Sequence, residues 1–295
     1  MQSNVLPTGR RALQKLEVSE KFYLQATLQW TNNTSVSFTQ LRYEVCERVA
    51  YITLNRPEKR NALTPTLITE LRHAFQHAQD DAGVRVVVLQ AEGKAFCAGL
   101  DLDELRALSA KSAMDNLYDS ETLAALFREI YTHRKFVISK VQGAAFAGGC
   151  GLACAADVVI ADRDHAKFSY SEAKIGFVPA IVAALILRRS RHAGVREMLL
   201  RAHVLSADDA LRLGLINYSV PSHDITSFTE QLAQDVCHTT SPMSIELTKR
   251  LLWSVETMSL DDAINFAMHL NAFSRQTSDL QKGIASFLTK EPIQW

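Results

Sequence analysis

Strong charge of either sign and long apolar runs are both missing from this chain. Its 295 residues carry 32 Lys plus Arg against 32 Asp plus Glu, and this balance argues against a protein that binds nucleic acid through bulk positive charge. The longest uncharged segment, residues 141–156, is interrupted by four glycines and is shorter than the roughly 20 apolar residues of a spanning helix. We therefore expect no membrane segment and regard a nucleic-acid partner as disfavoured.

Cysteine is scarce, and its pattern suggests no pairing. The five cysteines form no CxxC motif, so neither a disulfide framework nor a zinc site is indicated. A reducing compartment is favoured, and we expect the protein in the cytoplasm. Cys150 and Cys154 are spaced for one face of a helix, as small buried side chains often are. His73 and His77 share this spacing but have no apparent third ligand, so no metal is predicted.

Several catalytic signatures are missing as well. The chain has no GxSxG nucleophile elbow, no Walker loop and no GxGxxG dinucleotide fingerprint. Its composition, with 47% apolar and 22% charged residues, is nevertheless that of an ordinary globular protein. A chain of this length can bury a large core without disulfides.

What the chain does have is an alternation of strand-like and helix-like segments. Short runs rich in β-branched residues predict strands at 49–54, 84–89, 136–141 and 157–161. Helical patterns lie between them at 122–131 and 150–155, and a further helix has Thr64 as its N-cap and Pro65 at its first position. This order predicts an α/β fold in which crossover helices connect parallel strands.

The two ends of the chain differ from this middle. A polar break at residues 32–35 sets off residues 1–36, whose role the pattern does not indicate. From Ser206 onward the pattern is helical, and Ser206 with Asp209 predicts a capping box. The last helices carry large apolar side chains that belong either to an ordinary core or to a contact between subunits: Trp253, Phe266, Met268, Phe273 and Phe287.

Two turns that contain glycine follow predicted strands. Residues 95–102 (AFCAGLDL) come after the strand at 84–89, and residues 143–153 (GAAFAGGCGLA) come after the strand at 136–141. Backbone N–H groups in such strand–turn–helix segments point toward ligands, and two of them together can hold a developing oxyanion. A tight turn and close helix–strand packing are the alternative explanations of these glycines.

A third segment, residues 168–180 (FSYSEAKIGFVPA), places Glu172 among largely apolar residues. A carboxylate held in such surroundings has a raised pKa and can act as an acid or a base near neutral pH. The alternative is a glutamate in a solvated loop.

In their order and spacing, these segments resemble the crotonase superfamily, the enoyl-CoA hydratase/isomerase family. Three more segments are similar to its signatures: residues 56–63 (RPEKRNAL), 206–215 (SADDALRLGL) and 283–290 (GIASFLTK). The resemblance extends over residues 37–295 and leaves residues 1–36 without a counterpart. It implies a spiral of repeated ββα units at 37–205 that carries a CoA thioester site. A C-terminal helical region at 206–295 would assemble trimers, often paired into hexamers.

The resemblance also implies a set of site residues. The backbone amides of Ala98 and Gly148 would hold the thioester oxygen, and Glu172 would move the proton. The CoA part of the substrate would lie among six residues: Lys59, Arg60, Ala62, Asp101, Leu102 and Lys290. No separate cofactor is implied, because coenzyme A is part of the acyl-CoA substrate.

One position departs from the family pattern. Well-studied hydratases carry a glutamate where this chain has Gly151, and two carboxylates are their usual means of holding and splitting water. A single carboxylate serves the Δ3,Δ2-enoyl-CoA isomerases. The stretches 148–153 and 172–180 nevertheless resemble bacterial methylglutaconyl-CoA hydratase-like members, which also carry glycine there. We therefore predict a 2-enoyl-CoA hydratase in fatty-acid or branched-chain breakdown, with the isomerase as the alternative.

A more remote alternative is an RNA-binding or non-catalytic family member. Its basic strip would consist of Arg188, Arg189, Arg191 and Arg196. A solvated helix face is the ordinary explanation of such a strip.

Overall fold

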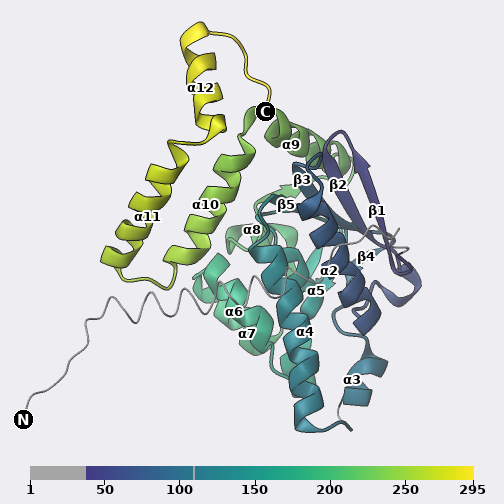
Figure 1. Cartoon of the computed structure of the whole chain (residues 1–295). Coiled ribbons are helices and arrows are strands. Elements are labelled where there is room, and N and C mark those ends of the chain that lie inside the picture. The colour runs from purple at the N-terminus through teal and green to yellow at the C-terminus, as the bar shows by residue number, and fades with distance from the viewer. Residues whose placement is uncertain (1–37, 109) are drawn as a thin grey trace, which may run out of the picture. The chain divides into compact units, whose positions relative to one another are not determined.

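The protein is described by a computed structural model at residues 38–108 and 110–295, and the predicted N-terminal segment 1–36 lies outside the described residues. Six strands form the larger of two sheets (Figure 1), in the order β1 (Leu41–Cys46), β2 (Val49–Leu54), β3 (Val86–Ala91), β5 (Phe136–Val141), β7 (Val158–Asp162) and β10 (Tyr218–Val220). β1 pairs with β2 antiparallel, and every other neighbouring pair is parallel. The four predicted strands are all present, within two residues of their expected bounds.

A second sheet of four short strands contains β4 (Ala95–Cys97), β6 (Ala144–Phe146), β8 (Lys167–Ser169) and β9 (Leu205–Ser206). β4, β6 and β8 each follow a strand of the large sheet directly, so the chain steps from one sheet to the other three times. A helical segment comes next each time: α3 (Leu102–Leu108) and α4 (Ala113–Tyr131), then α5 (Gly148–Cys154), then η2 (Ser171–Ile175) and α6 (Ala180–Arg189). The predicted repetition of ββα units is therefore present.

The central strands are apolar on both sides because helices cover both faces of the large sheet. In β3, Val87 and Leu89 belong to the main core, which α2 (Pro65–Asp80) helps to form. Val86 and Val88 face a second cluster that includes side chains of α9 (Ile225–Thr239). This two-sided burial explains why the strand has a continuous apolar run in the sequence rather than an alternating one.

Local signals at helix ends are confirmed where they were predicted. The Thr64 side chain accepts a hydrogen bond from the Leu67 N–H at 3.1 Å, with Pro65 at the first helical position of α2. The capping box of Ser206 and Asp209 is formed at the start of α8 (Ala207–Arg212). α4 begins nine residues earlier than predicted, because Ser112 caps an additional, mostly exposed N-terminal half.

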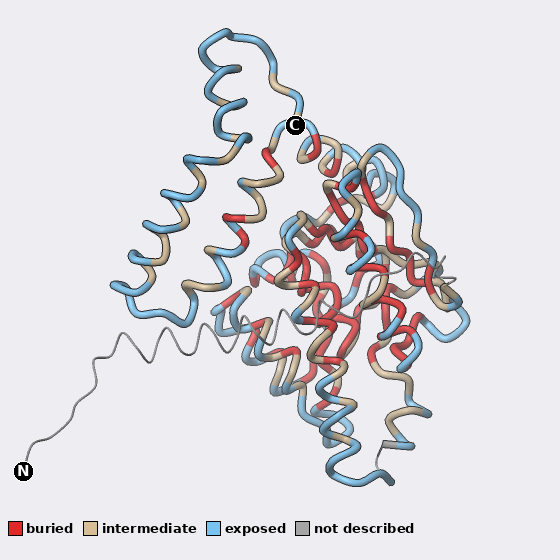
Figure 2. The backbone as a smooth tube through the Cα atoms, viewed as in Figure 1, coloured by how far each residue is buried: buried red, intermediate tan, exposed pale blue. Residues whose placement is uncertain are grey.

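The sheet continues past residue 205, because β10 pairs with β7. The chain completes this region with α7 (Ala193–Arg201), α9 and α10 (Pro242–Val255), and ends with α11 (Leu260–Ser274) and α12 (Ser278–Thr289). A buried ion pair ties α10 to the sheet: Lys249 Nζ lies 2.5 Å from Asp157 Oδ2. Figure 2 shows α11 and α12 with no buried residue. None of the helices in the described part of the chain has the length and apolarity that crossing a membrane requires.

Candidate active site

The turn between β2 and α2 is held by a buried asparagine. Asn61 is completely buried; its Oδ1 accepts from the Arg56 N–H at 2.8 Å, and its Nδ2 donates to the carbonyls of Glu92 and Ala95, each at 2.9 Å. These bonds fasten the turn to the start of β4. The sequence segment 56–63 contained Asn61 as part of a motif, but only the fold shows what its side chain does.

The loop after β4 runs along this turn and forms backbone hydrogen bonds with it. The Ala98 N–H donates to Arg60 O at 3.1 Å, the Leu63 N–H donates to Gly99 O at 2.7 Å, and the Asp101 N–H donates to Leu63 O at 2.9 Å. Among the described residues, the Leu100 N–H has no acceptor. The amide predicted as a free donor, that of Ala98, is therefore engaged, and the free donor of this loop belongs to Leu100.

The loop after β6 lies against the first loop. Ala147 adopts φ 50°, and its N–H donates to Ser169 O at 2.8 Å. The next N–H, that of Gly148, has no acceptor in the described part of the chain. A Cβ at Gly99 would lie 2.8 Å from Ala147 Cβ and 3.3 Å from Gly148 N. Only glycine at position 99, with φ +92°, lets the two loops approach this closely. The unengaged Leu100 and Gly148 amides thus belong to two loops in contact.

Glu172 lies in η2 and is 7% exposed. Its Oε2 is buried and has no hydrogen-bond partner among the described residues. Burial raises the pKa of this carboxyl, and a bond from its own backbone N–H opposes the rise. The solvated-loop interpretation is excluded, because a buried carboxylate without a partner is destabilised in its charged form and is poised to accept a proton.

The position of Gly151 is closed by its neighbours. An ideal Cβ at Gly151 would lie 2.2 Å from Val182 Cγ1 on α6 and 3.5 Å from Phe127 Cζ on α4. Gly151 and Val182 are both buried. Residue 151 therefore supplies no carboxylate, and the space that a side chain there would need is occupied by Val182.

The residues predicted to surround CoA are brought together in part. Lys59 and Arg60 lie exposed at the end of η1 (Pro57–Lys59), beside the buried Ala62. Arg56 Nη2 lies 3.8 Å from Asp101 Oδ2, with both side chains less than one-fifth exposed. Leu102, the first residue of α3, is 74% exposed.

Within a single chain, Lys290 lies apart from the other residues predicted to surround CoA. It is exposed at the C-terminal cap of α12, and α12 packs against α10. Figure 1 shows α12 and α3 at opposite ends of residues 38–295. One copy of the chain therefore does not bring Lys290 to the other five residues.

The predicted basic strip is partly used by the fold itself. The Arg189 guanidinium donates to the carbonyl of Leu215 at 2.6 Å and to that of Ala156 at 2.6 Å. Arg188 Nε lies 3.1 Å from Glu256 Oε2. At least two of the four arginines thus have structural partners.

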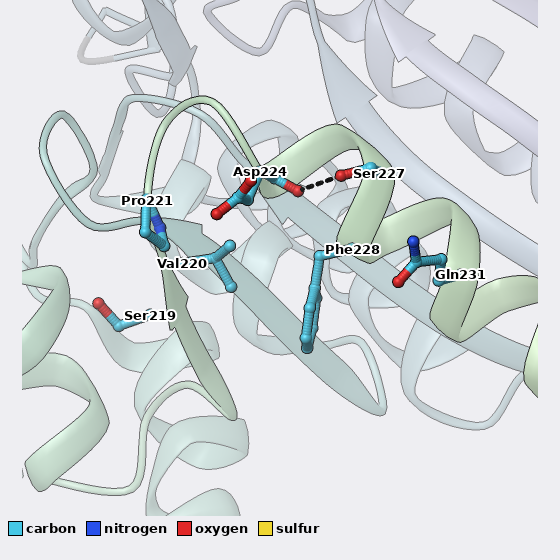
Figure 3. Close-up of a pocket in the computed structure, with 7 residues that line it drawn as sticks. All are labelled: Ser219, Val220, Pro221, Asp224, Ser227, Phe228 and Gln231. Atoms are coloured by element: carbon cyan, nitrogen blue, oxygen red, sulfur yellow. Dashed lines mark hydrogen bonds between the residues drawn. The ribbon is translucent and has the colours of Figure 1, made fainter.

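A hollow of about 410 Å³ lies elsewhere, between β10 and α9. Figure 3 shows Val220 and Phe228 in its wall, with Ser227 Oγ donating to the Asp224 carbonyl at 3.0 Å. It contains neither Glu172 nor the two free amides. Within residues 38–108 and 110–295, no group of His, Cys, Asp and Glu side chains is arranged to hold a metal ion.

Comparison with known proteins relates the chain to one family. A family model described as enoyl-CoA hydratase/isomerase matches residues 44–295. A Thermus thermophilus protein whose name describes an enoyl-CoA hydratase is 39% identical over 244 residues, which cover 83% of this chain and 96% of that protein. The (E)-benzylidenesuccinyl-CoA hydratase of Thauera aromatica is 30% identical over 249 residues, with coverage of 83% and 94%. An enoyl-CoA hydratase structure from Mycobacterium smegmatis has a TM-score of 0.81 at 30% identity and covers 87% of this chain and 99% of that chain.

Proposed function

Because the chain belongs to the enoyl-CoA hydratase/isomerase family of the crotonase superfamily, we propose that it is a hydratase that adds water to a 2-enoyl-CoA thioester. The combination of two unengaged amides with a buried, unpartnered carboxylate supports enolate chemistry on a thioester, and the relatives that are named as hydratases favour the addition of water. Leu100 and Gly148 supply the amides, and Glu172 supplies the carboxylate. Thioester chemistry through an enolate needs these two functions: donors for the oxygen and a base for the proton.

In the proposed reaction, Glu172 takes a proton from water while the water oxygen bonds to Cβ of the substrate. The electron pair of the Cα–Cβ double bond moves toward the thioester carbonyl and forms an enolate. The N–H groups of Leu100 and Gly148 stabilise the enolate oxygen. Glu172 then returns the proton to Cα, and the product is a 3-hydroxyacyl-CoA thioester.

The alternative is a Δ3,Δ2-enoyl-CoA isomerase, and one observation favours it. Gly151 has no side chain, and Val182 fills the adjoining space, so Glu172 has no second carboxylate opposite it on α5. Glu172 alone can remove a proton from C2 of a 3-enoyl thioester and return it to C4. The two candidate reactions share the enolate and the same two amides.

The substrate's CoA part is assigned to the surface formed by residues 59–62 and 101–102, where Lys59 and Arg60 are exposed and can contact phosphate groups.

Large apolar side chains are exposed on α11 and α12, for example Ile264 and Phe287. Such a surface is usually buried against a partner, and we assign this role to other copies of the chain in a trimer or hexamer. In such an assembly Lys290 reaches CoA from a neighbouring subunit. All five cysteines are free thiols, which fits the cytoplasm.

The experiment that tests the proposal is product analysis with a panel of CoA thioesters in deuterated water. The panel contains crotonyl-CoA, 3-methylglutaconyl-CoA and 3-hexenoyl-CoA. A hydratase converts the first or second thioester to its 3-hydroxyacyl product with one deuterium at Cα. Conversion of 3-hexenoyl-CoA to the 2-enoyl thioester, without any hydrated product from the panel, would replace the hydratase by the isomerase.

A further inference from the structure

The unengaged Leu100 amide lies between two backbone hydrogen bonds to Leu63. The Leu63 N–H donates to Gly99 O at 2.7 Å, and the Asp101 N–H donates to Leu63 O at 2.9 Å. Leu63 and Leu100 thus pair as residues of neighbouring parallel strands do. Because successive N–H groups of a strand point to opposite sides, the Leu100 N–H points away from Leu63. The direction of this donor therefore depends on Asp101 staying in place.

The side chain of Asp101 connects the loop to two other elements. Its Oδ1 accepts from the Asp103 N–H at 3.1 Å, and its backbone carbonyl accepts from the Leu105 N–H at 2.9 Å, so Asp101 caps the start of α3. Its Oδ2 lies 3.8 Å from Arg56 Nη2. One carboxylate therefore joins the loop to α3 with one oxygen and faces the turn before α2 with the other.

Arg56 is fixed within that turn. Its Nη1 donates to Ala62 O at 2.9 Å, and its backbone N–H donates to Asn61 Oδ1 at 2.8 Å. The side chains of Arg56 and Asp101 are only 16% and 13% exposed, whereas the two basic residues at 59–60 are exposed and their charges are weakened by water. The positive charge of Arg56 is therefore both held in place and shielded from solvent beside the carboxylate.

The carboxylate of Asp101 lies close to the point at which negative charge develops in the proposed reaction. Covalent geometry keeps its oxygens within about 12 Å of an enolate oxygen bound to the Leu100 N–H. At an effective dielectric constant of about 20, one unpaired negative charge at about 12 Å would slow enolate formation about tenfold. A positive charge beside the carboxylate cancels most of this repulsion.

We propose that Arg56 is a positioning residue of the enolate reaction and that it acts through Asp101. Its guanidinium holds the carboxylate that fixes the loop and the Leu100 N–H, and it cancels the charge of that carboxylate near the enolate. This inference rests on the enolate chemistry of the proposed function, which the hydratase and the isomerase share.

The test measures kcat and KM of the full-length protein on the thioester of the panel that the wild type converts fastest. The variants are Arg56→Gln, Arg56→Lys, Asp101→Asn and the double variant Arg56→Gln/Asp101→Asn. Glutamine keeps N–H donors, and asparagine keeps an oxygen that can accept from the Asp103 N–H, so the main change is in charge. Arg72→Gln is the control, because Arg72 on α2 pairs with Glu129 on α4 and its replacement removes the same charge.

The expected result is that the two single changes of charge act in opposite directions. Arg56→Gln should lower kcat about tenfold, and Asp101→Asn should raise it. The double variant should have a kcat about tenfold above that of Arg56→Gln, because the two lost charges compensate. Arg56→Lys, which keeps the charge, should turn over at least about threefold faster than Arg56→Gln. Arg72→Gln should have the kcat of the wild type. Any loss of CoA contacts at Asp101 would appear in KM.

A kcat of Asp101→Asn below that of the wild type would overturn the inference, because the ion pair would then only hold the loop together. A kcat of Arg56→Gln within about threefold of the wild type would overturn it as well. If Arg56→Gln does not fold, as judged by circular dichroism, the direction of the change in Asp101→Asn decides alone.

The same assays separate this inference from the proposed function. A wild type that isomerises 3-hexenoyl-CoA but hydrates no thioester of the panel would replace the hydratase, while the opposite effects of Arg56→Gln and Asp101→Asn would still support the inference. A wild type that converts none of the thioesters would remove both.

Discussion

Adding one methyl group at position 151 tests the packing of Val182 against Gly151, which leaves no room for a side chain there. A Cβ there lies 2.2 Å from Val182 Cγ1 and 3.0 Å from Val182 Cβ, so Gly151→Ala must displace Val182 or separate α5 from α6. Overpacking of this kind costs about 1–3 kcal/mol, and the better helix propensity of alanine returns at most about 1 kcal/mol. We expect a net loss of about 1–2 kcal/mol in the free energy of unfolding.

The assay is urea unfolding followed by circular dichroism, at one protein concentration because subunit association contributes to stability. Gly283→Ala is the matched control: its Cβ in α12 has its nearest neighbour, Trp295 Cη2, at 3.8 Å. This control should be neutral or more stable by up to about 1 kcal/mol. A Gly151→Ala protein as stable as wild type would refute the packing argument.

A double variant tests whether the side chains at positions 151 and 182 compete for the same space. Val182→Ala alone removes two buried methyl groups, worth about 1.6 kcal/mol of transfer free energy. In Gly151→Ala/Val182→Ala the new methyl group occupies the vacated space, so the double variant should be at least about 1 kcal/mol more stable than additivity predicts. Strict additivity would show that the two side chains do not compete for one volume.

Because Val182 leaves no room for a side chain at position 151, a carboxylate can be tested there only if Val182 is also made smaller. Gly151→Glu as a single change should lose activity for steric reasons, whether the enzyme is a hydratase or an isomerase, so it cannot separate the two chemistries. In the Val182→Ala background the carboxylate has more room. If Gly151→Glu/Val182→Ala hydrates crotonyl-CoA faster than Val182→Ala does, the native enzyme is an isomerase. If it hydrates crotonyl-CoA more slowly, the native enzyme is a hydratase that binds water at another place.

Three further predictions concern the amides, the base and the assembly. Gly99→Ala should lower turnover by about 10²-fold, because its Cβ meets Ala147 Cβ at 2.8 Å; Gly214→Ala, which also has a positive φ but no contact under 3.6 Å, should keep normal turnover. Because burial raises the pKa of Glu172 above 4.5 and the base must be ionised, kcat/KM should fall with decreasing pH around a midpoint above 4.5, and this limb should be absent in Glu172→Gln. Light scattering at micromolar concentration should give a trimer or a multiple of it, and deletion of the residues after Ser206 should leave insoluble protein; a stable monomer of the full chain would contradict the assembly.

Local signals in the sequence were enough to predict much of the framework. Thr64 and Pro65 define the start of α2, and β2 and β5 coincide with apolar, β-branched runs because both lie inside the large sheet. β1 was not predicted as a strand. Only Leu41 in it is buried, and the strand exists through its pairing with β2 and through Glu70, whose carboxylate holds the Thr39 and Gln40 N–H groups.

The finer features of the site depend on contacts between residues far apart in the chain. The sequence brings Ala98 and Leu100 into the same loop, but the bond from Ala98 N–H to Arg60 O decides which amide is free. The absent side chain of Gly151 was visible in the sequence, whereas its filling by Val182 was not. The sequence identified Glu172 as a candidate base, yet only the fold shows that its Oε2 is buried and has no hydrogen-bond partner among the described residues.

The most direct measurement of the central claim is turnover by Glu172→Gln on the thioester of the panel that the wild type converts fastest. Glutamine keeps the size of the side chain but cannot accept the proton, so kcat should fall by about 10²- to 10⁴-fold. The dissociation constant of butanoyl-CoA should stay within about threefold, because the Leu100 and Gly148 amides and the CoA contacts remain. Turnover close to that of the wild type, in a variant with an unchanged circular dichroism spectrum, would contradict the account by leaving the reaction without its base.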